Sequence, residues 1–96
     1  MNKFSKVIGL LALGCFASVS AQAGDGPEFW SCSELWQNRN QIYKSAGYCF
    51  RTQRGIRAFG NAGCQYDDVS DVPLSINQRR DVAEITRYER VKRCPK

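Results

Sequence analysis

The distribution of cysteines constrains the fold of this chain more than any other feature. Four of them, Cys32, Cys49, Cys64 and Cys94, are spread over a short segment that follows an apolar N-terminus. A domain this small has a marginal hydrophobic core, and covalent cross-links are the usual remedy. The alternative, a zinc site, has no support, because the chain has no histidine and no Cys-x-x-Cys spacing. We therefore expect two disulfides, and neither a metal nor a cofactor.

The N-terminus has the three parts of an export signal in their usual order. Two lysines precede an apolar run over residues 7–19, and a small-residue pattern ends at Ala23. This order predicts a signal peptide over residues 1–23 and a periplasmic or secreted location. The run is shorter than the roughly 20 residues that a membrane-spanning helix needs, so no transmembrane anchor is expected. Lipidation at Cys15 is the alternative, but the residues before it match a lipobox poorly.

Cleavage after the signal would leave a small basic domain. Removing 23 of the 96 residues leaves 73, and losing Lys3 and Lys6 lowers the net charge from +5 to +3. A chain of this length has room for one domain at most. Residues 24–30 contain two glycines and a proline, which predicts a flexible leader before a domain over residues 31–96.

The apolar spacing in the first half of that domain predicts helices. Apolar side chains at three- and four-residue intervals indicate a helix over about 34–46, with Gly47 placed as its C-cap. A short second helix over about 53–59 would be capped by Thr52. The fold class is therefore mostly α.

The second half predicts a long ordered loop and then another main helix. Residues 61–75 contain glycine, proline and three aspartates, a composition typical of a loop. Ser75 and Gln78 have capping-box spacing and indicate a helix over about 76–93. Its buried stripe is expected to contain Val82, Ile85, Val91 and either Tyr88 or Glu89. Two i,i+4 ion pairs are expected on its exposed face, Arg80 with Glu84 and Glu89 with Arg93.

These helices restrict the disulfide pairing. If the two main helices pack antiparallel, Cys32 just before one lies at the same end of the pair as Cys94 at the end of the other. Cys49 and Cys64 flank the short helix and could clip that segment. Of the three possible connectivities, we therefore predict Cys32 with Cys94 and Cys49 with Cys64.

One segment resembles a known family. Residues 35–43, Leu-Trp-Gln-Asn-Arg-Asn-Gln-Ile-Tyr, followed by Gly47-Tyr48-Cys49-Phe50, are similar to the core of the YARHG domain, a small module of exported bacterial proteins. The family is named for a Tyr-Ala-Arg-His-Gly run, of which this chain keeps Tyr43 and Gly47. Ser45 and Ala46 replace the arginine and histidine, so chemistry that depends on that histidine is absent here. The resemblance implies an exported domain and no particular activity.

Arg39 is the most unusual residue of the first helix, because it lies on the apolar stripe. A buried guanidinium needs partners, since an unpaired buried charge is costly. The first hypothesis is a structural arginine that pins the long loop through Asp67, Asp68 or backbone carbonyls. The second is a clamp for an anion or carboxylate, with Asn40 and Tyr43 beside it.

Arginines and aromatic residues are the remaining candidates for binding. If they cluster, they suit an anionic polymer or stacking on sugars. The alternative is a solvated surface of mixed charge. Expected partners are peptidoglycan, an acidic glycan or another exported protein, whereas nucleic acid is not expected without a recognised motif. The candidate binding residues are Arg39, Asn40, Tyr43, Tyr48, Arg54, Arg57 and Tyr66.

The loop carboxylates raise two further possibilities. Asp67, Asp68 and Asp71 are hard oxygen ligands, but their spacing does not match a calcium-binding EF-hand loop. They could also serve as an acid/base pair in a small hydrolase acting on an envelope polymer, which is the alternative function. The lack of histidine, of a serine-nucleophile elbow and of a metal motif favours a non-catalytic envelope-binding module, for which no catalytic residue is assigned.

Overall fold

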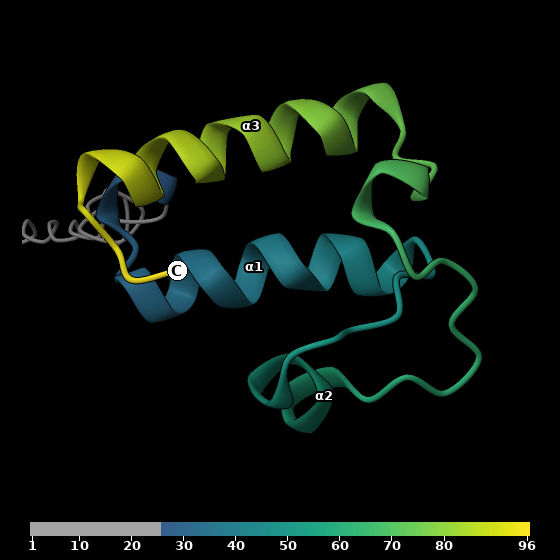
Figure 1. Ribbon diagram of the computed structural model, residues 1–96. Coiled ribbons are helices and arrows are strands. Elements are labelled where there is room, and N and C mark those ends of the chain that lie inside the picture. The colour runs from purple at the N-terminus through teal and green to yellow at the C-terminus, as the bar shows by residue number, and fades with distance from the viewer. Residues whose placement is uncertain (1–25) are drawn as a thin grey trace, which may run out of the picture.

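The computed structural model describes residues 26–96 and confirms a mostly α fold (Figure 1). The predicted signal peptide at residues 1–23 lies outside the described residues. The three α-helices are α1 (Cys32–Ser45), α2 (Gln53–Phe59) and α3 (Ile76–Val91). Two short 3-10 helices, η2 (Pro27–Phe29) and η3 (Val69–Asp71), precede α1 and α3 respectively.

The core lies between α1 and α3, which run side by side in opposite directions (Figure 1). Leu35 of α1 is fully buried and Ile85 of α3 nearly so. Val91, predicted to be buried, is instead 66% exposed. The reason is helical geometry, because Glu89 takes the inward position and a residue two places further on points to the opposite side.

Serine capping boxes begin both main helices. At α1, the Glu34 N–H donates to Ser31 Oγ at 3.1 Å and the Ser31 N–H donates to Glu34 Oε1 at 2.8 Å. This box starts α1 two residues earlier than predicted. The predicted box of Ser75 and Gln78 is present at the start of α3.

The end of α1 is a Schellman motif built on Gly47. The Tyr48 N–H donates to the Tyr43 carbonyl at 3.0 Å, and the Gly47 N–H donates to the Lys44 carbonyl at 3.1 Å. Gly47 has φ of 99°. A Cβ added there would lie 3.2 Å from the Tyr66 ring. Glycine therefore suits both the positive φ and the close approach of the tyrosine ring.

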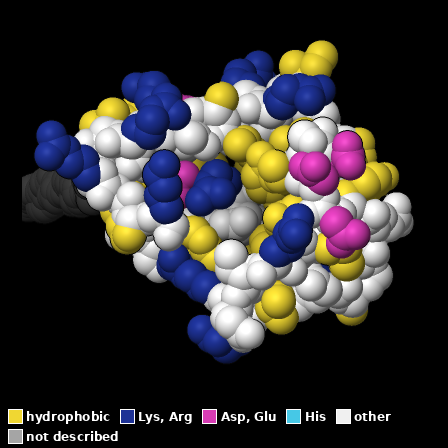
Figure 2. Space-filling view, viewed as in Figure 1, with side chains coloured by type: hydrophobic (Ala, Val, Ile, Leu, Met, Phe, Trp, Pro, Cys, Tyr) yellow, Lys and Arg dark blue, Asp and Glu magenta, His cyan; other side chains and the backbone are white. Residues whose placement is uncertain are grey.

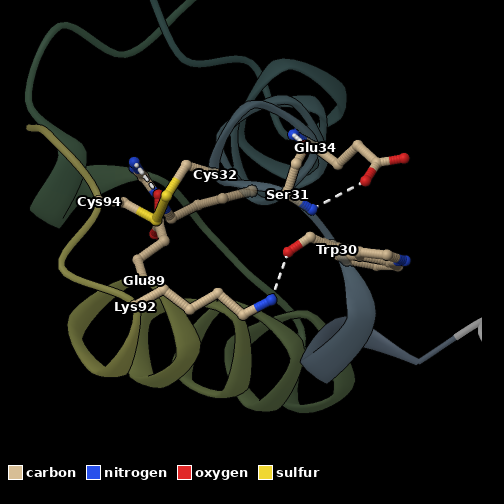
Figure 3. The surroundings of a disulfide bond; sticks show 8 residues. Trp30, Ser31, Cys32, Glu34, Glu89, Lys92 and Cys94 are labelled. Atoms are coloured by element: carbon tan, nitrogen blue, oxygen red, sulfur yellow. Dashed lines mark hydrogen bonds and ion pairs between the residues drawn. A yellow bond between two sulfur atoms is a disulfide. The ribbon is translucent and has the colours of Figure 1, made fainter.

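Both predicted disulfides are confirmed. Cys32 and Cys94 join the start of α1 to the segment after α3, with Cα atoms 5.4 Å apart (Figure 3). Cys49 and Cys64 enclose α2, with Cα atoms 5.1 Å apart. The antiparallel arrangement of α1 and α3 thus brings the distant pair together as the sequence suggested.

The α2 segment is attached to α1 by aromatic rings. Phe59 of α2 stacks on Phe50 with centroids 5.0 Å apart, and it also contacts Trp36 of α1 at 5.8 Å. The buried Phe50 has its backbone clamped by one amide: its N–H donates to Asn61 Oδ1 at 2.7 Å, and Asn61 Nδ2 donates to its carbonyl at 2.9 Å. The aromatic rings and this clamp hold a helix of seven residues that would be too short to be stable alone.

Residues 27–30, predicted to belong to a flexible leader, are held against the main helix pair. η2 packs against α3, and Lys92 Nζ donates to the Trp30 carbonyl at 2.6 Å (Figure 3). None of the helices within residues 26–96 is long and apolar enough to cross a membrane.

Candidate functional site

Arg39 is held by α3 and not by the long loop, so its predicted partners were wrong. Its Nε donates to Glu89 Oε1 at 2.7 Å and its Nη2 donates to Glu89 Oε2 at 3.1 Å. The side chains of Arg39 and Glu89 are 28% and 13% exposed. This forked geometry explains why Arg39 lies on the apolar stripe, because it matches a carboxylate on the facing helix. Glu89 consequently pairs across the core and not with Arg93 as predicted.

The second predicted ion pair is absent as well. Arg80 donates to the side chain of Asn77, one turn earlier, and forms no ion pair with Glu84. Within residues 26–96 the Arg39–Glu89 contact is the one ion pair present. The exposed face of α3 therefore carries charges that are not neutralised by their helix neighbours.

Asn40, Tyr43, Tyr48 and Tyr66 do not gather into one clamp with Arg39. Asn40 is 8% exposed and its Nδ2 donates to the Trp36 carbonyl at 2.9 Å. The Tyr43 and Tyr48 rings lie 5.9 Å apart, and Tyr48 forms an isolated parallel bridge with Tyr66. The three tyrosines are half-buried and build the junction between α1 and the loop.

Arg54 and Arg57 lie on α2. The guanidinium carbon of Arg54 lies 3.8 Å from the centroid of the Trp36 ring, a cation–π contact. Arg57 donates to Gln53 Oε1 at 3.5 Å within the same helix. Both arginines are exposed, and Arg54 also covers the Trp36 ring.

The loop aspartates serve the loop itself. Asp68 caps η3 by accepting from the Ser70 N–H at 3.0 Å and from Ser70 Oγ at 2.8 Å. These hydrogen bonds, with a smaller contribution from the charge of Arg51, hold the pKa of the Asp68 carboxyl below its ordinary value. No group of three or more potential metal ligands occurs within residues 26–96.

A basic groove opens beside the Cys32–Cys94 disulfide. It has a volume of about 600 Å³ and is lined by Arg39 of α1 and by the last turn and tail of α3. Figure 2 shows Lys and Arg side chains gathered over this end of α3 and its seam with α1, with a carboxylate between two of them. The charged residues of the groove are Arg39, Glu89, Arg90, Arg93 and Lys96. Because Glu89 is already bound to Arg39, the groove has a clear excess of positive charge.

Arg93 reaches this groove from an unusual backbone conformation. Its φ is 56°, and it occupies the position that Gly47 has at the end of α1. The Cys94 N–H donates to the Glu89 carbonyl at 2.9 Å and the Arg93 N–H donates to the Arg90 carbonyl at 3.0 Å, which completes a second Schellman motif. Left-handed backbone is unfavourable for arginine, and such strain is found preferentially at functional sites.

Sequence reasoning found Arg39 but missed the rest of the groove. The spacing of the arginines in the last helix does not distinguish Arg90 and Arg93 from the others, so nothing in it marks the end of α3 as special. The signal that was available is positional: residues 86, 89, 90 and 93 share one side of a helix. Recognising it required knowing how α3 faces α1, which brings Glu89 against Arg39.

A second groove lies along the α1–α3 seam beside η2. It has a volume of about 440 Å³, with Ile42 and Ile85 from the two helices lining it. Its other walls are Pro27, Trp30, Asn38, Gln41, Asp81 and Glu84. The two charged groups are carboxylates, so this acidic groove has the opposite sign to the basic groove.

The chain belongs to the YARHG domain family, whose family model matches residues 20–90. No curated protein and no solved structure matches the chain. The segment that corresponds to the family's naming motif forms the last turn and C-cap of α1. Tyr43 supplies the carbonyl and Gly47 the left-handed residue of the Schellman motif, so these two positions have a structural role here.

Proposed function

We propose that this YARHG domain is an exported, non-catalytic module that binds an anionic polymer of the cell envelope in its basic groove. The observation that carries the proposal is the convergence of Arg39, Arg90, Arg93 and Lys96 on one groove whose one acidic side chain, Glu89, is already engaged. Arginine side chains pair well with carboxylate and phosphate groups because of their planar forked geometry. An acidic glycan or peptidoglycan offers such groups.

Two features support this assignment. The first is the backbone of Arg93, since a left-handed arginine has an energetic cost that a glycine at the same place would avoid. The second is the placement of the three loop aspartates. Asp68 caps η3, and none of the three lines either groove. Both features support binding over the alternative hydrolase.

Export and the domain boundaries are part of the proposal. Two disulfides are typical of an oxidising compartment, and this agrees with a signal peptide over residues 1–23 and a domain over residues 31–96. Mass spectrometry of the protein recovered from periplasm or medium should give a mass starting at Gly24 and no free thiol. A retained N-terminus, or a mass that includes a lipid on Cys15, would contradict cleavage after Ala23.

The binding test measures retention of the mature protein on purified peptidoglycan sacculi and on a polyuronate gel. The double variant Arg90→Glu with Arg93→Glu should weaken retention about tenfold or more, and raising salt from about 50 to 500 mM should release the parent protein. Arg79→Glu with Arg80→Glu is the matched control, because it makes the same change in net charge on the same helix outside the groove.

The variant of α2 distinguishes the two basic surfaces. Arg54→Glu with Arg57→Glu should weaken retention if α2 adds a second contact to the polymer. Equal losses in all three double variants would mean that net charge, and not the groove, drives retention. Retention that is insensitive to salt would contradict the electrostatic proposal altogether.

A further inference from the structure

The acidic groove has features that the proposed function does not use. Its carboxylates, Asp81 and Glu84, are exposed and one turn apart on α3, where their like charges repel each other. Neither carboxylate makes a hydrogen bond or ion pair with any residue in the part of the chain that the structure describes. On a protein with excess positive charge, this groove is therefore a local site of unneutralised negative charge.

Arg80, which precedes Asp81 in the sequence, and Lys92, which contacts Trp30, are both bonded to other groups. Arg80 donates to Asn77, and Lys92 donates to the Trp30 carbonyl at 2.6 Å without lining the groove. An external cation bound here would relieve the repulsion between the two carboxylates. Trp30 also lines the groove, and the face of an indole ring attracts a cation.

The other residues that line the acidic groove indicate what else a ligand would need. Ile42 and Ile85 form an apolar surface, with Pro27 at the side. The amides of Asn38 and Gln41 line the groove beside them, and Asn38 Oδ1 is left over after its Nδ2 donates to the Glu34 carbonyl at 2.8 Å. These surfaces suit a ligand that has an aliphatic stem, a charged amine and polar amide groups.

We propose that the acidic groove binds the side chain of a lysine-like residue in a peptide. The ammonium lies between the carboxylates of Asp81 and Glu84, and the aliphatic stem lies on Ile42 and Ile85. The peptide amides meet Asn38 and Gln41. The volume of about 440 Å³ is sufficient for a chain of this size. This inference goes beyond the proposed function, because it uses the other groove and a ligand of opposite charge.

The groove is held in shape before any ligand arrives. The Ser31–Glu34 capping box and the Lys92 bond fix the backbone at Trp30 from both sides, and the Cys32–Cys94 disulfide holds the adjacent chain ends (Figure 3). Figure 3 shows the Trp30 ring directed away from the disulfide, on the other side of its own backbone. Preorganisation of this kind reduces the ordering cost of binding.

The test is an NMR titration of the mature disulfide-bonded protein, following the Trp30 indole N–H and the Gln41 side-chain amide. The probe is acetyl-lysine methylamide, and acetyl-norleucine methylamide is the control that keeps the stem but lacks the amine. We expect saturable shifts at both reporters with the lysine probe, and an affinity for the norleucine control at least tenfold weaker. Equal affinity for the two probes would overturn the proposal.

Variants and a second ligand complete the test. Asp81→Asn with Glu84→Gln keeps size and should weaken lysine binding at least tenfold, while Asp67→Asn with Asp71→Asn removes two carboxylates outside the groove and should change nothing. n-Butylamine supplies the same stem and single amine without peptide amides: tighter binding of the lysine probe supports a peptide ligand, and equal binding restricts the site to free amines and rejects the peptide. Retention on the polyuronate gel should stay unchanged in the Asp81→Asn with Glu84→Gln variant. Failure of the lysine proposal can therefore be distinguished from failure of the proposed polymer binding.

Discussion

The ends of α1 and α3 have the same backbone design and different residues. Each helix finishes in a Schellman motif with one left-handed residue, and a disulfide cysteine follows within two positions. At α1 the left-handed residue is Gly47, which the nearby Tyr66 ring also requires. At α3 it is Arg93, and its side chain lines the basic groove. The residue at position 47 is therefore determined by folding, whereas at position 93 folding alone would favour glycine over the arginine that is present.

The largest expected effects come from the disulfides that follow the two motifs. Cys32→Ser with Cys94→Ser opens a loop with a sequence separation of 62, and Cys49→Ser with Cys64→Ser opens one of 15. Loop-closure entropy predicts losses of about 4 and about 3 kcal/mol respectively. Urea unfolding measures both losses. In the Cys49→Ser with Cys64→Ser variant, hydrogen exchange should show the backbone amides of α2 losing protection first. A larger loss for the shorter loop would contradict the loop-closure argument.

Arg39→Ala comes next, because it breaks the ion pair that joins the two helices. Removing the guanidinium leaves a 13% exposed Glu89 without its partner, which should lower the free energy of unfolding by about 2 to 4 kcal/mol. Arg39→Lys should restore part of this, since an ammonium cannot donate in the same forked geometry. Arg79→Ala, on the exposed face, is the control. A parent-like melting curve for Arg39→Ala together with lost polymer binding would make Arg39 a ligand residue and not a structural one.

Gly47→Ala and Arg93→Gly test the comparison of the two helix ends directly, because they should change the free energy of unfolding in opposite directions. An alanine at Gly47 adds a Cβ 3.2 Å from the Tyr66 ring at a positive φ, so we expect a loss of about 1 to 3 kcal/mol. Arg93→Gly relaxes the backbone at the matching position and should raise stability by up to about 1 kcal/mol. The same variant should weaken retention on the anionic polymer. If Arg93→Gly destabilises the domain, the arginine has a folding role and the interpretation of its strain is wrong.

The fold was largely predictable because its signals are local. Capping at Ser75, the C-cap at Gly47 and the cysteine positions each depend on residues close in sequence, and together they led to the correct disulfides. Even the earlier start of α1 was signalled by Ser31 and Glu34, three residues apart. The partner of Arg39 was not predictable, since it depends on a residue 50 positions away and on the rotation of α3. The grooves were missed for the same reason, because they exist only where the two helices face each other.

The smallest expected effect lies in the loop between α2 and α3. Hydrogen bonds from the Ser70 N–H and Oγ favour the charged form of Asp68 and lower its pKa. A carboxyl whose folded pKa is lowered stabilises the native state above its unfolded pKa, and this contribution is lost as pH falls below about 4. NMR of the Ser70 amide between pH 5 and 2 should follow the loss of the η3 cap. Ser70→Ala removes the Oγ bond and should move the midpoint to higher pH, while Asp67→Asn should leave the Ser70 titration as in the parent. A Ser70 amide that does not titrate over this range would show that the cap does not depend on the charge of Asp68.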